Sequence, residues 1–178
     1  REELGYLLGK YDLWSRYEPE VRGVMIAYAS VYGGTENAAN VLACRLAEQG
    51  VQVKMFDVSV TPAPYVVSDA FKYSHLVFAS ATYNMGIFVT MEDLLHDIAA
   101  HALADRRYAL IENGTWSPAS GKKMDALLSP LKGWSAVEPV LTVKSALRPD
   151  QAAQMQRLAD AIAADVKAQN NPSDWGIN

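Results

Sequence analysis

The strongest constraint on the fold of this chain is a nearly continuous apolar run at residues 24–29, followed by a turn with two glycines and then by a helical pattern. A strand that is apolar on both faces is typical of a central parallel strand covered by helices on each side. Similar strand-like and helix-like segments alternate along the rest of the chain. This alternation predicts a doubly wound α/β domain with right-handed crossovers.

The pattern predicts five strands and five helices after residue 20. Strands are expected at residues 24–29, 51–57, 75–80 and 108–111, and within residues 135–143, where Pro139 marks a bend. Helices are expected at residues 35–49, 65–73, 90–103, 120–131 and 149–169.

The ends of the chain are expected to lie outside the domain. Residues 1–20 contain several aromatic side chains and end in Glu-Pro-Glu, which indicates a tethering linker or the tail of a preceding domain rather than a core strand or helix. The sequence assigns residues 21–170 to the domain and residues 171–178 to an irregular tail.

The composition excludes several classes of protein. Half of the 178 residues are hydrophobic, which is enough for one domain with a substantial core. The net charge of -4 argues against binding to a nucleic-acid backbone, and no apolar stretch approaches the ~20 residues of a membrane span. Cys44 is the only cysteine, so no internal disulfide can form, and a reducing, cytoplasmic location is expected.

Ligands of doubly wound sheets bind beyond the carboxyl ends of the strands, so the loops after the first, third and fourth strands are the candidate site. The first loop, SVYGGTE at residues 30–36, combines hydroxyls, two glycines and a helix N-terminus. This combination suits a phosphate held by neutral donors, because the loop lacks the lysine of a nucleotide P-loop. The other interpretation is a plain turn in which Thr35 caps the helix.

The second and third loops supply flat side chains. SATYNMGIF, residues 80–88, offers Tyr83 as a stacking ring and a turn in which Gly86 permits a peptide to reorient. ENGTWSPASG, residues 112–121, offers Trp116. The alternatives are a polar turn with Tyr83 on the surface and a Trp116 that only covers the domain. Together the three loops predict a ligand with a phosphate at one end and a planar ring at the other.

The stretches YASVYGGTE, SATYNMGIF and GTWS resemble the three FMN-binding loops of flavodoxins, above all those of the flavodoxin-like domain of flavodiiron proteins, the A-type flavoproteins. The stretch DLWSRYEPE resembles the linker that follows the diiron domain in that family. The resemblance implies a flavodoxin-like, five-stranded parallel sheet in the order 2-1-3-4-5 with helices on both faces. The third loop departs from the family, because Pro118 and Ala119 stand where the family has glycines.

The resemblance implies FMN as the cofactor. The phosphate would be bound by the first loop, with Ser30, Val31, Tyr32, Gly33, Gly34 and Thr35. The isoalloxazine would be lined by Ala81, Thr82, Tyr83, Asn84, Met85 and Gly86, with the peptide near Met85 as the candidate partner of flavin N5. Its other side would be flanked by Asn113, Gly114, Thr115 and Trp116. No catalytic residue is expected, and no metal ligand, since His96 and His101 are spaced wrongly for one helix face.

The function implied by the resemblance is electron transfer through FMN to the diiron centre of an oxygen or nitric oxide reductase. The diiron domain, absent here, would belong to the same or a partner chain. A rubredoxin-like or other electron donor is expected, the full-length protein is expected to form a homo-oligomer, and no independent turnover is expected from this chain. The alternatives are a free-standing flavodoxin, an FMN-dependent NAD(P)H:quinone reductase and a non-catalytic assembly domain. Nucleic acid and membranes are not expected as partners.

Overall fold

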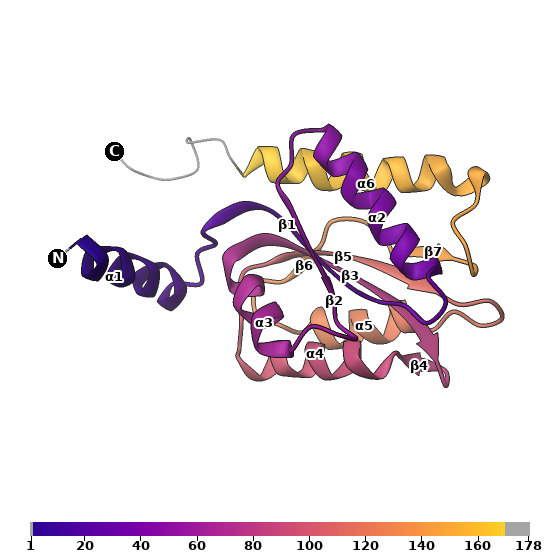
Figure 1. Cartoon of the computed structure of the whole chain (residues 1–178), viewed down its shortest axis with the longest axis horizontal. Coiled ribbons are helices and arrows are strands. Elements are labelled where there is room, and N and C mark those ends of the chain that lie inside the picture. Colours follow the sequence, from indigo (N-terminus) through magenta and orange to yellow (C-terminus); the bar gives the residue numbers. More distant parts are fainter. Residues whose placement is uncertain (1, 170–178) are drawn as a thin grey trace.

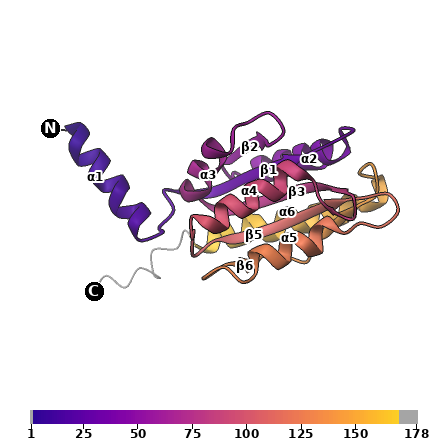
Figure 2. The ribbon, with the colours of Figure 1, turned by 90° about the horizontal axis from the view of Figure 1, so that it is seen from below.

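The computed structural model describes residues 2–169, which form a three-layer α/β/α domain preceded by a separate helix (Figure 1). The helices are α1 (Glu2–Ser15), α2 (Gly34–Glu48), α3 (Ala63–Lys72), α4 (Val89–Ala100), α5 (Ser120–Leu128) and α6 (Ala152–Ala168), with a short 3-10 turn, η1 (Pro149–Gln151). The strands are β1 (Val21–Ala29), β2 (Val53–Asp57), β3 (Tyr73–Tyr83), β4 (Gly86–Ile87), β5 (Arg107–Asn113), β6 (Ser135–Ala136) and β7 (Leu141–Val143). Helices α2 and α6 cover one face of the sheet, and α3, α4 and α5 cover the other (Figure 2).

The main strands are parallel and lie in the order β2-β1-β3-β5, with β6 and β7 both pairing with β5 at the far edge. With the short antiparallel β4 set aside, this is the predicted 2-1-3-4-5 order, and the predicted fold class is confirmed. The strand count differs, because the described residues form a seven-stranded sheet. The predicted fifth strand is split into β6 and β7, and Pro139, which has no N–H to donate to a ladder, lies between them.

The two central strands explain why the sheet is covered on both faces. Residues 23–27 of β1 and the first eight residues of β3 are all buried. Successive side chains of a strand point to opposite faces, so Met25 and Phe78 pack with the layer of α3, α4 and α5. Ile26 and Val77 pack with α2 and α6 on the other face. The apolar run that predicted a doubly covered strand therefore supplies both halves of the core.

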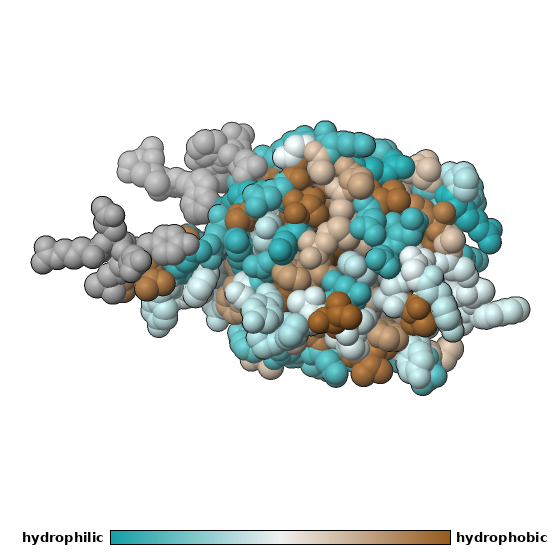
Figure 3. All heavy atoms as spheres, viewed as in Figure 1, coloured by the Kyte–Doolittle hydropathy of each residue, from teal (hydrophilic) through white to brown (hydrophobic). Residues whose placement is uncertain are grey.

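The segment before the domain is helical, which the sequence pattern did not predict. Helix α1 projects away from the body in both ribbon views, and Leu7, Leu8 and Tyr11 on it are exposed. In the space-filling view the body shows apolar patches among polar side chains, and α1 stands beside it (Figure 3). The assignment of this segment as a linker remains a prediction. No helix within residues 2–169 has the length and apolar character needed to cross a membrane.

A buried cation lies at the junction between α1 and the domain. Arg106, directly before β5, has a relative exposure of only 1%. Its guanidinium donates hydrogen bonds to backbone carbonyls from separate parts of the chain, those of Tyr17, Ala70, Phe71, Ala104 and Asp105. Burial lowers the pKa of Arg106 to about 10, so the side chain remains a cation at neutral pH. A buried charge of this kind is tolerated because the surrounding carbonyl dipoles satisfy its donors.

Tyr17 connects α1 to this cation. It ends the helix in the left-handed conformation, with φ 57, and the N–H of Glu18 donates to the carbonyl of Leu13 over 2.9 Å, as in a Schellman motif. The carbonyl of Tyr17 accepts from Arg106 Nη1 over 2.6 Å, and its ring stacks on Phe71 with centroids 6.4 Å apart. The exit of α1 is thereby held at a defined point on the domain.

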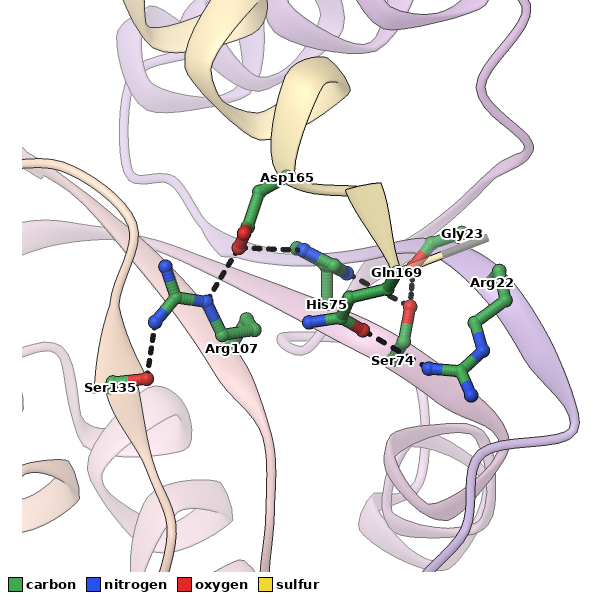
Figure 4. Close-up of polar contacts among 8 residues, drawn as sticks. All are labelled: Arg22, Gly23, Ser74, His75, Arg107, Ser135, Asp165 and Gln169. Atoms are coloured by element: carbon green, nitrogen blue, oxygen red, sulfur yellow. Dashed lines mark hydrogen bonds and ion pairs between the residues drawn. The ribbon is translucent and has the colours of Figure 1, made fainter. Parts of the chain in front are cut away.

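A histidine is buried near the amino end of β3 (Figure 4). His75 Nε2 lies 3.1 Å from Asp165 Oδ2 of α6, and His75 Nδ1 lies 2.8 Å from Ser74 Oγ. The arrangement fits a neutral ring whose Nε2–H donates to the carboxylate. The hydroxyl of Ser74 lies between two acceptors for its one proton, His75 Nδ1 and the carbonyl oxygen of Gly23 at 3.3 Å. Asp165 also accepts a hydrogen bond from Arg107 Nε. The histidine thus links the central strand to the last helix.

We expect this histidine to make stability fall on mild acidification. Burial is the main cause that lowers the pKa of His75, with Arg107 and Arg22 adding to it and Asp165 opposing it. A base whose folded pKa lies below its unfolded value is neutral when native, so stability is present above about pH 6.5 and decreases as pH falls through the folded pKa. Urea unfolding measured at intervals between about pH 7 and pH 5 should show a free energy of unfolding that decreases by up to about 1.4 kcal/mol per pH unit as the pH falls.

The variant His75→Asn should flatten this slope, because its amide does not titrate. The matched control is His96→Asn, at an exposed side chain of α4, which keeps His75 and its contacts with Ser74 and Asp165, so the part of the slope that His75 contributes should remain. A His75→Asn protein with an unchanged slope would assign the acid sensitivity to other groups.

Candidate functional site

The three loops meet around a cavity of about 180 Å³ at the carboxyl ends of β1, β3 and β5. Its walls are formed by Ser30, Val31, Tyr32, Gly34, Thr35, Ala81, Thr82, Asn113, Gly114, Thr115 and Ser145. All of these except Ser145 are predicted site residues, so the structure brings members of all three loops together. Larger hollows of about 660 and 590 Å³ lie beside α6 and between α3 and α4, and no predicted site residue lines either of them.

The first loop leaves the start of α2 open. Gly33, with φ 82, is the N-cap residue of α2, and no side chain caps the helix. The interpretation of Thr35 as the cap is therefore wrong, since Thr35 lies within the first turn and is buried. The hydroxyl of Ser30 is buried and has no hydrogen-bond partner within the described residues. Because an unpaired buried polar group costs about 1–3 kcal/mol, this hydroxyl and the free helix N–H groups suit the oxygens of an anionic group.

The second loop is a tight hairpin between β3 and β4. Thr82 pairs with Ile87 and Tyr83 with Gly86, and the turn between them consists of Asn84 and Met85. Both turn residues have positive φ, 47 and 60 respectively, as a type I′ turn requires. The conformational strain therefore falls on Asn84 and Met85 rather than on Gly86, the residue from which we expected flexibility. Strain of this kind, roughly 1–2 kcal/mol for a residue such as methionine, is concentrated at functional sites.

The aromatic side chains of the second and third loops face outward. Tyr83 is half-exposed and packs edge-on against Phe88, with centroids 5.9 Å apart and planes at 76°. Trp116 is 97% exposed. Met85 is exposed as well, and so is Tyr32, which lines the cavity. Tyr83 and Trp116 directly follow the cavity residues Thr82 and Thr115 in the chain, and their predicted contacts with a flat ring remain predictions.

The first N–H groups of α5, which also starts at this edge, are occupied. The carboxylate of Glu112 accepts from the N–H of Gly121 over 2.9 Å, and Thr82 Oγ1 accepts from the N–H of Ser120 over 3.3 Å. At α4, Ser80 Oγ accepts from the N–H of the N-cap residue Phe88 over 3.2 Å, which leaves the first turn of that helix without a side-chain cap. Of the helices that start at this edge, α2 is the one whose first residues, Gly34 and Thr35, line the cavity.

Ser145, in the turn after β7, is the cavity residue that the sequence did not reveal. It has a positive φ of 67, and its main chain is hydrogen-bonded by the side chain of Asn113. The turn carries none of the glycine or aromatic signals of the other three loops. Only the pairing of β7 with β5 brings Ser145 to the same edge.

The comparison with protein families matches residues 26–170 to the flavodoxin model. This chain belongs to the flavodoxin family. Nitric oxide reductase from Moorella thermoacetica is 24% identical to this flavodoxin-family chain over 166 residues, which is 93% of the chain and 41% of that protein. The chain therefore spans about two fifths of the length of that relative.

Solved structures share the fold of this flavodoxin-family chain. The rubredoxin oxygen:oxidoreductase of Desulfovibrio gigas superposes with a TM-score of 0.87 at 23% identity, covering 94% of this chain and 41% of the other. The flavodiiron protein of Giardia intestinalis superposes with a TM-score of 0.82 at 18% identity, covering 94% of this chain and 42% of the other. The resemblance predicted from the three loops, to flavodoxins and to flavodiiron proteins, is confirmed at the level of family and fold.

Proposed function

We propose that this flavodoxin-family chain binds FMN in the three-loop cavity and serves as an electron-transfer domain. The observation that carries the proposal is the buried, unpartnered hydroxyl of Ser30 beside the uncapped N-terminus of α2. Both lie in a cavity that collects residues from all three loops. A phosphate monoester supplies several acceptor oxygens to such donors, and the exposed rings of Tyr83 and Trp116, next to the cavity residues Thr82 and Thr115, suit a planar ring.

The residues of the chain have separate tasks in this proposal. The first loop binds the phosphate through hydroxyl and backbone N–H donors, since none of the described residues that line the cavity is a Lys or an Arg. Thr82 holds the second and third loops together, because its hydroxyl oxygen accepts from the N–H groups of Ala119 (3.1 Å) and Ser120. FMN supplies the redox chemistry when bound. The protein binds it, orients it and shields one end of it from water.

The acceptor of the electrons is proposed to be the diiron centre of an oxygen or nitric oxide reductase, in a domain of the same or a partner chain. Two observations support this proposal. The compared proteins are named nitric oxide reductase and rubredoxin oxygen:oxidoreductase, and this chain covers only 41% of each. Within this proposal a rubredoxin-like protein or another carrier donates the electrons, and the full-length protein is a homo-oligomer.

We expect the purified chain to retain FMN after reconstitution and desalting, with flavin absorption bands and quenched flavin fluorescence. Replacing Ser30 with Ala removes one buried donor to the phosphate and should weaken FMN binding about tenfold. The matched control is Ser68→Ala, an exposed serine on α3, which should bind FMN like the wild type. If the wild type retains no flavin at micromolar concentrations, the proposed function is wrong.

A further inference from the structure

The side-chain amide of Asn113, in the third loop, forms a pair of hydrogen bonds with the main chain of Ser145, in the turn after β7. The N–H of Ser145 donates to Asn113 Oδ1 over 2.9 Å, and Asn113 Nδ2 donates to the carbonyl of Ser145 over 3.0 Å. We call this arrangement the Asn113–Ser145 clasp. A third contact joins Ser145 Oγ and Thr115 Oγ1 at 2.7 Å. The Asn113 side chain donates from Nδ2 and accepts at Oδ1, both to the main chain of Ser145, and this pair of bonds fixes the orientation of the amide.

The clasp lies directly against the first residue of α2. A β-carbon built on Gly34 would lie 1.9 Å from the carbonyl oxygen of Ser145 and 3.0 Å from Asn113 Nδ2. Only glycine allows this approach, since any side chain at position 34 would displace the turn. The φ of Gly34 is not in the left-handed region, so close approach rather than conformation explains the glycine.

The clasp joins the first and third loops, whose strands are not neighbours in the sheet. The first loop follows β1 and the third loop follows β5, and β3 lies between these two strands. Their separation is therefore not set by direct strand pairing. The clasp connects Asn113, the last residue of β5, with Gly34, the first residue of α2, through the turn at Ser145. The clasp therefore contacts the open N-terminus of α2 from the side of the third loop.

We propose that the turn at Ser145 is a fourth loop of the FMN site, and that the Asn113–Ser145 clasp positions the N-terminus of α2 for the phosphate. The inference rests on the proposed function and adds Ser145 as a positioning residue that acts through its main chain. It separates two roles for Asn113. A direct contact with the flavin ring affects FMN and riboflavin alike, whereas a role in positioning α2 affects only the ligand that carries a phosphate.

The test is to titrate the apoprotein with FMN and, separately, with riboflavin. The quenching of flavin fluorescence reports binding in both titrations. The readout is the ratio of the two dissociation constants, riboflavin over FMN. In Asn113→Ala the clasp is absent, and this ratio should fall by about tenfold or more, with riboflavin affinity nearly unchanged. If a variant loses the same factor of affinity for FMN and for riboflavin, it has lost only a ring contact or general stability. That result overturns the inference.

Two substitutions at Ser145 isolate its main chain. Ser145→Gly keeps the N–H, the carbonyl and the positive φ, so the preference for FMN should be retained. Ser145→Pro removes the N–H and restricts φ to negative values, so the preference should fall as in Asn113→Ala. If wild type and all three variants prefer FMN equally, the inference is wrong while the proposed function stands. A wild type that binds neither flavin overturns both.

Discussion

Replacing Arg106 with Met is expected to lower the free energy of unfolding by about 3 kcal/mol, while the fold is retained. Methionine fills much of the volume of the arginine stem but offers no donor. The five carbonyls that now accept from the guanidinium would then be left without this partner in a buried site. Unpaired buried acceptors cost more than the net gain of the hydrogen bonds that they replace. Urea unfolding followed by circular dichroism measures the difference.

The control for this experiment is the next residue in the chain. Arg107 is 29% exposed and pairs with Asp165 at the surface, so Arg107→Met should cost about 1 kcal/mol or less. Both variants remove one positive charge, but Arg106 is buried among backbone carbonyls, whereas Arg107 is partly exposed and bonds the carboxylate of Asp165 and the hydroxyl of Ser135. Equal losses in the two variants would show that the five carbonyls find water when the guanidinium is removed.

The contacts of Arg106 also illustrate what sequence patterns do not contain. Its carbonyl partners reach back as far as Tyr17, 89 residues earlier. Helix α1 was missed although Leu7, Tyr11 and Trp14 have the i, i+4, i+7 spacing of one helix face; these side chains are exposed instead of forming part of the core. It also ends at Tyr17 in a left-handed conformation, where the usual glycine signal is absent.

The central sheet, in contrast, follows from local pattern. Residues 24–29 and 75–80 were predicted as strands because they are apolar on both faces, and both lie within β1 and β3. The prediction for β5 began and ended short, since Arg107, Glu112 and Asn113 are polar residues that join the strand through pairing with its neighbours. The fifth strand was located, but its division into β6 and β7 depends on pairing with β5 that no local pattern records.

In the candidate site, too, the sequence predicts the position of the loops but not their internal geometry. Its first three loops could be predicted because each directly follows a strand that the apolar pattern identifies, and parallel strands end at one edge. The geometry within the loops could not. The left-handed Asn84 and Met85 arise from the pairing of β4 with β3, and the position of Ser145 arises from contacts with Asn113, 32 residues away.

Replacing Gly34 with Ala is expected to weaken FMN binding by about 100-fold. The added β-carbon would meet the carbonyl oxygen of Ser145 at 1.9 Å, and this neighbour is backbone, which cannot rotate away. The turn must move by more than an ångström or α2 must shift, and either movement breaks the alignment of the helix N-terminus with the phosphate. Fluorescence titration with FMN measures the loss.

The matched control lies just beyond the other end of the same helix. Gly50 has φ 77 and no atom within 4 Å of an added β-carbon, so Gly50→Ala should destabilise the fold by about 1 kcal/mol and leave FMN affinity unchanged. A double variant sharpens the argument. If Gly34→Ala acts by displacing the turn at Ser145, its effect on FMN binding should shrink when Asn113→Ala has already released that turn. Full additivity of the two substitutions would instead place the cost of Gly34→Ala in a direct collision with the cofactor.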